Sequence, residues 1–390
     1  MIKKINVIIL LVFLSPGVYC DSPVLQSYIQ RFSSADLLGK ADILREVSSN
    51  ASLGQYSGQF YEHALRFVLD NHAQMSNIRE MNNIVNVSIN GLRDSGCVEN
   101  LDILWRLFLA YPNSEAGAEI LITLGILGKG NRDVIDNINF YLMERNLQVR
   151  SGRSVDYVKV SACISAIMEM GDSSSYPVLF SSICAGYPEV IASEAYGALE
   201  LIPGNLNLFL LNVIGNNPPE EKFAAFRTGI NSRRLNLPER GQLAELALEQ
   251  SLAVDEESVD LTAMSYAAVQ TLTSLRWTRA NALAIRHYYR VQANFLYGTA
   301  PKERFIEAIA CMGAVGNSEA ALVLGLQLGL INGRMERTGS FDEEITLAIV
   351  QSLGLIGDKA VFDHLLNVIN LPYPENIHAA AREAIDRLKW

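Results

Sequence analysis

The chain has 390 residues, of which 49% are hydrophobic and 19% are charged, and its formal net charge is −10. This acidic balance disfavours binding to the phosphate backbone of nucleic acids and to anionic lipid surfaces. A chain of this length exceeds what one hydrophobic core usually organises, so several domains or a repeat array are expected.

The first twenty residues have the three-part layout of a secretory signal peptide. Lys3 and Lys4 precede an apolar run over residues 5–14, and a short polar end follows. Because this run is too short to span a bilayer comfortably, residues 1–20 are predicted to direct export and to be removed. The expected location of the mature protein is the periplasm.

Two cleavage sites compete around Cys20. Cleavage after Cys20 would release a soluble protein, with Val18 and Cys20 as the small residues before the bond. Cleavage before Cys20 would make this cysteine the lipid-bearing first residue of a bacterial lipoprotein, although Tyr19 is bulky where that class of protein has a small residue. Membrane attachment is therefore predicted only if Cys20 is lipidated.

Residues 21–112 have an irregular helical pattern. Leu25, Tyr28 and Phe32 belong to one apolar face, and the polar stretch 48–59 is expected to form a long loop. Terminal repeats commonly differ from internal ones because their outer face meets water. We therefore predict a divergent helical cap over residues 21–112, with a separate small helical domain as the alternative.

From residue 113 to residue 390 a helix-turn-helix unit recurs about every forty-one residues. Met-Gly-Ala-Val-Gly-Asn at 312–317 returns as Leu-Gly-Leu-Ile-Gly-Asp at 353–358, and Gly130 and Gly171 have the same separation. A glycine can end a helix in the left-handed conformation, and an Asn or Asp after it can cap the next helix. The pattern predicts an all-α fold, an α-solenoid of antiparallel helix pairs.

These helix pairs resemble HEAT repeats. The Leu-Gly-x-x-Gly-Asp turn and the Ala-Ala-Arg-x-Ala-Ile pattern at 380–385 look most like the short bacterial HEAT-like repeats first associated with phycobilin lyases. The resemblance covers roughly residues 113–388 and implies a right-handed superhelix whose concave face binds other proteins. A tetratricopeptide array is the competing interpretation, but its paired Trp and Tyr signature is not seen.

The sequence lacks the common catalytic motifs. It contains no His-Glu-x-x-His, Cys-x-x-Cys, Gly-x-x-x-x-Gly-Lys or Gly-x-Ser-x-Gly, and no His-Glu pair of the kind that binds iron in HEAT-like hydroxylases. We expect a non-enzymatic protein that needs no cofactor and no metal. A lyase or chaperone-like enzyme that uses the solenoid groove to hold its substrate is a less favoured alternative.

Cys163 and Cys184 are candidates for a disulfide. They lie on either side of Gly171, on the two helices of one predicted hairpin, and their neighbours are small residues that permit close approach. Export allows oxidation of the pair. The other interpretation, which the usual behaviour of unpaired cysteine favours, is two buried free thiols.

The segment 261–301 contains no Asp or Glu, although acids exceed bases in the whole chain. It is instead rich in arginine and aromatic residues, the types enriched at protein interaction hot spots. Six of its residues form the predicted partner contact, here called the Arg/aromatic ridge: Arg276, Trp277, Arg279, Arg286, Tyr289 and Arg290. The alternative is that the aromatic residues fill the core and the arginines pair with acids of adjacent units.

The sequence thus predicts an exported scaffold of the bacterial cell envelope that binds a protein partner through the Arg/aromatic ridge. The main alternative is a structural envelope lipoprotein that is attached to the membrane through Cys20.

Overall fold

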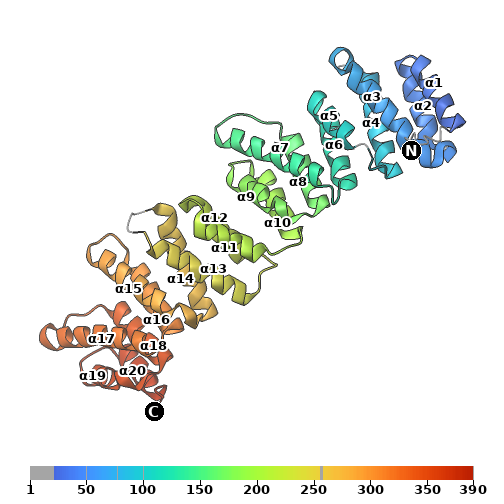
Figure 1. Ribbon diagram of the computed structural model, residues 1–390. Coiled ribbons are helices and arrows are strands. Elements are labelled where there is room, and N and C mark those ends of the chain that lie inside the picture. Colours follow the sequence, from blue (N-terminus) through green and yellow to red (C-terminus); the bar gives the residue numbers. More distant parts are fainter. Residues whose placement is uncertain (1–21, 50, 77, 100, 255–257, 390) are drawn as a thin grey trace, which may run out of the picture. The chain divides into compact units, whose positions relative to one another are not determined.

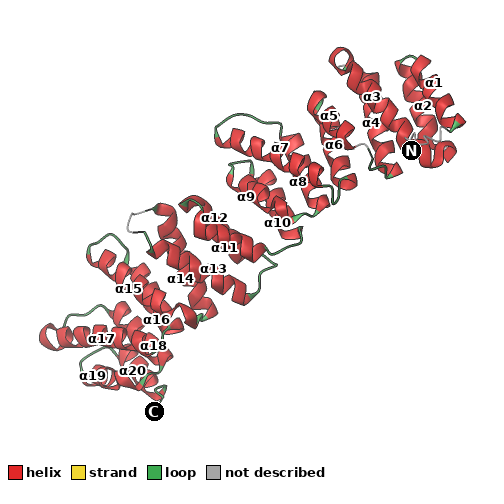
Figure 2. Ribbon diagram, viewed as in Figure 1, coloured by secondary structure: helices red, strands yellow, loops and turns green. Residues whose placement is uncertain are grey.

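The computed structural model describes residues 22–49, 51–76, 78–99, 101–254 and 258–389 (Figure 1). The predictions for the signal peptide and for Cys20 lie outside these residues. The described part of the chain is built from α-helices and short 3-10 helices, and it contains no β-strand (Figure 2). None of its helices is long and apolar enough to cross a membrane.

The chain divides into two compact units, Met1–Ser175 and Tyr176–Trp390. In the first unit α6 packs against both α4 and α8, and α3 packs against α4. Its helices are α1 (Pro23–Ser34), α2 (Leu37–Ser49), α3 (Ser57–Met75), α4 (Arg79–Ser95), α5 (Leu101–Ala110), α6 (Ser114–Leu127), α7 (Arg132–Arg150) and α8 (Tyr157–Met170), with 3-10 helices η1 (Ala51–Tyr56) and η2 (Ser173–Ser175).

The second unit begins with α9 and continues to the C-terminus. Its helices are α9 (Tyr176–Cys184), α10 (Glu189–Leu201), α11 (Leu206–Asn216), α12 (Pro219–Asn231), α13 (Leu237–Leu252), α14 (Val259–Leu275), α15 (Asn281–Leu296), α16 (Lys302–Val315), α17 (Ser318–Thr338), α18 (Glu343–Ile356), α19 (Phe362–Asn370) and α20 (Glu375–Asp386), with 3-10 helices η3 (Thr278–Ala280) and η4 (Lys359–Val361).

The helices of each unit pack on their neighbours along the chain, which confirms the predicted all-α solenoid. In the second unit α14, α16, α18 and α20 stack in succession, and α13, α15, α17 and α19 form the other layer. Each helix of this other layer packs on the even-numbered helix that follows it. The forty-one-residue period and the right-handed winding stay predictions.

The first glycine of each repeated motif lies inside a helix and allows close packing on the next repeat. A Cβ atom on Gly125 of α6 would stand 2.6 Å from Cα of Ala166 on α8. The same atom on Gly354 of α18 would stand 2.9 Å from Cα of Ala384 on α20. A glycine at these positions therefore permits the close approach of successive helices in one layer.

The Gly-Asx pairs end one helix and begin the next, as predicted. Gly171 and Gly357 end α8 and α18 with positive φ angles of 65° and 71°. Asp358 accepts a hydrogen bond from the backbone N of Ala360, and Asn317 accepts one from the backbone N of Glu319, both at 2.9 Å. These side chains therefore cap the following helices.

The loop expected over residues 48–59 is largely helical, so that prediction is wrong. The 3-10 helix Ala51–Tyr56 occupies its centre, and α3 begins at Ser57. Leu53 within it is only 3% exposed, so one apolar side chain fixes an otherwise polar segment to the core. Helices on both sides of residue 112 belong to the first compact unit, and α5 packs on α6. That residues 21–112 form a cap distinct from the repeats of residues 113–390 stays a prediction.

Candidate functional site

Helix α15 is bordered by two hollows. It contacts its layer neighbours α13 and α17 only sparsely, whereas α16 packs closely on α18 in the other layer. One hollow lies between α15 and helices α13, α14 and α16, and is called the polar cavity below. The other lies between α15 and helices α16, α17 and α18, and is called the apolar groove. Both belong to the second unit.

The apolar groove has a volume of about 660 Å³. Phe295 and Phe305 line it and stack on each other, with ring centroids 5.3 Å apart. Leu296, Leu326 and Leu330 line it while remaining 75%, 66% and 70% exposed. Large aliphatic side chains gathered at such exposure mark surfaces that bind another molecule.

Helix α17 carries an exposed stripe of leucines in addition to its buried face. Leu322, Leu326 and Leu330 recur every four residues and are all exposed. Leu324 and Leu328 of the same helix are completely buried. A four-residue step keeps side chains on one side of a helix, so α17 presents a second apolar face to solvent.

The rim of the apolar groove carries charges of both signs. Asp342 lies 3.6 Å from the ammonium of Lys302, which also pairs with Glu344 at 2.8 Å. Arg334 lines the groove from α17, is exposed, and makes no ion pair with any described residue. Arg334 is therefore the cation of this rim that is available to a carboxylate from another molecule.

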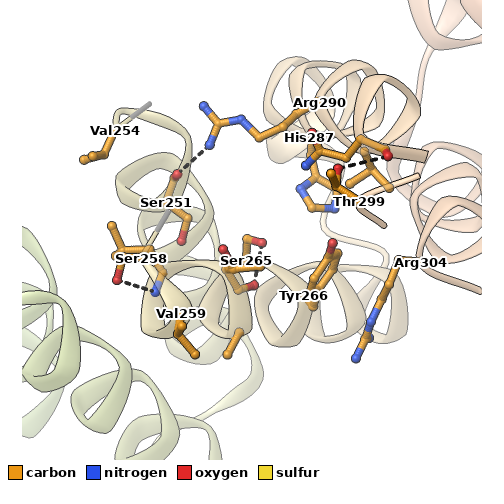
Figure 3. Close-up of a pocket in the computed structure, with 15 residues that line it drawn as sticks. Ser251, Val254, Ser258, Val259, Ser265, Tyr266, His287, Arg290, Thr299 and Arg304 are labelled. Atoms are coloured by element: carbon orange, nitrogen blue, oxygen red, sulfur yellow. Dashed lines mark hydrogen bonds between the residues drawn. The ribbon is translucent and has the colours of Figure 1, made fainter. Parts of the chain in front are cut away.

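The polar cavity has a volume of about 590 Å³ (Figure 3). Its described wall is rich in hydroxyl groups, including those of Ser258, Ser265, Tyr266 and Thr299. Two arginines and one histidine also line it, but no Asp or Glu does among the described residues. The described part of the wall thus offers hydrogen-bond donors and positively charged side chains.

His287 is the most unusual side chain of this wall. It is 2% exposed, and neither ring nitrogen has a hydrogen-bond partner among the described residues. Its ring meets Tyr266 edge-on, with centroids 5.9 Å apart, and Figure 3 shows it between Tyr266 and Arg290. Burial, together with the charge of Arg290, lowers the pKa of His287 to about 4. The imidazole is therefore neutral near pH 7.

Tyr266 links His287 to Arg304. The guanidinium of Arg304 lies over the Tyr266 ring, 4.4 Å from its centroid, and one of its Nη atoms pairs with Glu307 at 2.7 Å. The Tyr266 hydroxyl makes no hydrogen bond to a described residue, and burial raises its pKa. The Tyr266 hydroxyl and the two buried ring nitrogens of His287 therefore have no hydrogen-bond partner among the described residues.

The first half of the Arg/aromatic ridge contacts α13. Arg276 ends α14 in the left-handed conformation, with φ of 49°. The indole N–H of Trp277 donates to Oε2 of Glu245 at 2.7 Å, and Arg279 pairs with the same oxygen at 3.5 Å. A Cβ atom on Gly241 would stand 2.5 Å from the Trp277 ring, so the indole lies flat on α13.

The second half of the ridge divides between the two hollows. Arg286 and Arg290 are one turn apart on α15, and both donate to the backbone oxygen of Leu252, at 3.4 Å and 3.1 Å. Arg290 lines the polar cavity, whereas Tyr289 is half exposed in the apolar groove. The six ridge residues thus face several different neighbours, and their role in partner binding stays a prediction.

The described cysteines show no disulfide between Cys163 and Cys184. Cys163 is a free thiol that is completely buried, and burial raises its pKa well above the usual range for cysteine. The described residues also contain no cluster of three or more His, Cys, Asp or Glu side chains that could hold a metal ion.

Sequence reasoning overlooked both the leucine stripe and His287. Leu322, Leu326 and Leu330 are four residues apart in the sequence. The apolar residues of a helix are usually assigned to its buried face, so this spacing did not indicate a second, exposed face. His287 is one of five scattered histidines, and no sequence motif distinguishes it. Comparison of the chain with known protein families and with curated proteins finds no match.

Proposed function

We propose that this protein is a non-enzymatic helical-repeat scaffold that binds an amphipathic helix of a partner protein in the apolar groove between α15 and α17. The observation that carries this proposal is the exposed stripe of Leu322, Leu326 and Leu330 beside that groove. A stripe of this kind exposes apolar surface to water, and covering it with a partner would be favourable by about 25 cal/mol for each Å² buried.

The shape and the charge of the groove favour a helix with an acidic residue. Apolar side chains from α15 and α17 form its two sides, as expected for a groove that receives the apolar face of a helix. Arg334, which has no ion pair with any described residue, would meet a carboxylate of the bound helix. The partner segment should therefore carry leucine-like residues three or four positions apart and at least one Asp or Glu.

The proposed setting is the bacterial cell envelope. Residues 1–20 have the composition of an export signal, and the repeats resemble bacterial HEAT-like units. A periplasmic scaffold with neither cofactor nor metal is the simplest function compatible with both features. Tyr289 is the residue of the Arg/aromatic ridge that this proposal retains as a partner contact.

The test uses a photo-crosslinking amino acid placed at Leu326 or Leu330 in the native cells. The matched control is Leu208 of α11, which is 63% exposed and does not line the groove. We expect one and the same protein to be crosslinked from both groove positions and not from Leu208. Mapping the crosslink by mass spectrometry should place it in an amphipathic helix that contains an acidic residue.

The purified pair then tests the contact itself. Leu330→Glu should weaken binding at least tenfold, because it places a carboxylate in an apolar contact, whereas Leu208→Glu should leave binding unchanged. Arg334→Glu should also weaken binding if a carboxylate meets it. Equal crosslinking from Leu208, or a partner segment that is neither helical nor amphipathic, would refute the proposal.

A further inference from the structure

Two glutamine side chains interrupt the apolar lining of the groove between α15 and α17. Gln292 of α15 donates from Nε2 to Oε1 of Gln327 on α17 at 3.1 Å, and to the hydroxyl oxygen of Tyr288 at 3.2 Å. All three residues line the groove. A hydrogen-bonded pair of amides, here called the glutamine pair, therefore links α15 to α17 where the partner helix is proposed to bind.

The glutamine pair keeps one acceptor and one donor for another molecule. Oε1 of Gln292 and Nε2 of Gln327 make no hydrogen bond to another described residue. If both amides are turned over, the remaining groups are Nε2 of Gln292 and Oε1 of Gln327. In either arrangement one carbonyl oxygen and one NH₂ group are left. Both side chains are partly exposed, so water can satisfy these groups while the groove is uncovered.

We propose that the partner helix carries one Asn or Gln among its leucine-like residues, and that this amide binds the glutamine pair. The inference rests on the proposed function, because it describes the helix that binds in the apolar groove. The partner's NH₂ group would donate to the remaining carbonyl oxygen of the pair, and its carbonyl oxygen would accept from the remaining NH₂ group. Asn and Gln offer this donor and this acceptor on one neutral, planar group.

Covering the groove is the step that makes such an amide necessary. A helix that buries Leu326 and Leu330 would also remove water from the glutamine pair, since all four residues line the same groove. A donor or acceptor that loses its water without gaining a new partner weakens binding. A partner face made only of leucines would leave one such group on each glutamine. The groove should therefore bind these helices less well than helices with a matching amide.

The glutamine pair would give the groove a selectivity that its leucines lack. Hydrophobic contacts are not directional, so leucines accept apolar helices in several registers. In coiled coils a single buried polar residue fixes the register of the paired helices. A site that hydrogen-bonds a polar group also rejects analogues that lack this group. Gln292 and Gln327 are therefore specificity-determining residues of the groove, and the exposed leucines supply apolar contact.

The experiment selects peptides on the purified full-length protein from a displayed library of amphipathic helices. All peptides share one polar face that contains a Glu, and their apolar positions vary among Leu, Ser, Asn and Gln. We expect the unchanged protein to enrich peptides with one Asn or Gln among leucines. The double variant Gln292→Leu/Gln327→Leu should enrich peptides with leucine at every varied position, and this binding would also show that the variant is folded.

The matched control removes an amide pair outside the groove. Nδ2 of Asn207 donates to Oε1 of Gln242 at 3.3 Å, and neither residue lines the groove. Asn207→Leu/Gln242→Leu should enrich the same peptides as the unchanged protein. Leu330→Glu should abolish binding of these peptides, which would place them in the groove.

A double-mutant cycle with one selected peptide then measures the contact. Replacing its Asn or Gln by Leu should weaken binding to the unchanged protein at least about tenfold, because the glutamine pair loses its partner. The same replacement should not weaken binding to Gln292→Leu/Gln327→Leu. Fluorescence anisotropy of the labelled peptides gives the four affinities.

This inference and the proposed function fail in different ways. If no peptide is enriched, or if the enriched peptides still bind Leu330→Glu, the groove does not bind helices and both proposals are wrong. If peptides bind in the groove but the unchanged protein prefers only Leu or Ser at the varied positions, the proposed function stands and the role of the glutamine pair is refuted. Equal weakening of both proteins in the cycle would refute that role as well.

Discussion

Arg290 of α15 donates a hydrogen bond from Nη2 to the backbone oxygen of Leu252, 3.1 Å away, at the end of α13. Its Nη1 donates to the backbone oxygen of Ser251 at 2.9 Å. The last carbonyls of a helix lack partners within that helix and carry its negative dipole end. An arginine predicted to contact a partner protein therefore also caps a helix of its own chain.

Replacing Arg290 should consequently destabilise the protein. Arg290→Met removes both hydrogen bonds but keeps the aliphatic stem, and we expect a loss of about 1–2 kcal/mol in the free energy of unfolding. Denaturation in urea measures this change. Arg334→Met is the matched control, because Arg334 is exposed and has no ion pair with a described residue, and it should change stability by less than about 0.5 kcal/mol. Equal effects of the two variants would refute the capping role.

Arg276→Gly should stabilise the protein. Arg276 is the one described non-glycine residue with a positive φ angle, and it stands where Gly171 and Gly357 end their helices. The left-handed conformation costs a residue with a Cβ atom roughly 1–2 kcal/mol, part of which the greater unfolded-state freedom of glycine offsets. We expect a net gain of about 0.5–1 kcal/mol, measured by thermal or urea denaturation.

The reverse change provides the control for Arg276. Gly357→Ala should destabilise, because a Cβ atom there would stand 2.9 Å from the backbone oxygen of Arg387 and Gly357 has a φ angle of 71°. A stabilising effect of Gly357→Ala would show that the left-handed position does not limit stability at these helix ends.

Gly354→Ala should destabilise although alanine favours helices. The added Cβ would stand 2.9 Å from both Cα and Cβ of Ala384, so α18 and α20 would have to separate. Overpacking of this kind costs about 1–3 kcal/mol, more than the 0.5–1 kcal/mol that alanine gains over glycine in a helix. Gly197→Ala in α10 is the matched control, because no atom lies within 4 Å of its added Cβ. The control should gain roughly 0.5–1 kcal/mol, and calorimetry would show opposite shifts in melting temperature.

His287 should make the protein less stable as the pH falls. Its pKa is about 4 in the folded protein, whereas an unfolded histidine titrates near pH 6.5. Between these values the unfolded state binds more protons, so stability decreases as the pH is lowered from about 6.5 to about 4. Once the pH is below both pKa values, this difference lowers the free energy of unfolding by about 3 kcal/mol.

The variant His287→Leu should remove that pH dependence. We compare the free energy of unfolding of the variant with that of the unchanged protein. The difference, variant minus unchanged protein, should be about 2–3 kcal/mol larger at pH 4.5 than at pH 7.5. Urea denaturation at both pH values measures the difference. A constant difference between the two proteins would mean that His287 has the same pKa in the folded and the unfolded state.

The helical repeats themselves were predictable because their determinants are local. Asn317 and Asp358 cap helices through backbone groups two residues away, and Gly171 and Gly357 end helices through their own φ angles. Each of these effects depends on residues close together in the sequence. For the same reason the polar stretch around Leu53 was misread, since its helical structure depends on packing of that one side chain in the core.

The candidate sites depend on residues far apart in the sequence. Whether Arg290 reaches a partner or the end of α13 is decided by a carbonyl thirty-eight residues away, at Leu252. Leu328 and Leu330 are equally apolar, yet packing of the neighbouring helices buries the first and leaves the second 70% exposed.

The sequence by itself thus determined the all-α repeat architecture, because helix caps, glycine turns and apolar periodicity act within a few residues of one another. Only the tertiary structure decided which helix faces stay uncovered and which polar groups lack partners. The packing around α15 leaves Leu322, Leu326 and Leu330 of α17 exposed, and it leaves the nitrogens of His287 without partners among the described residues.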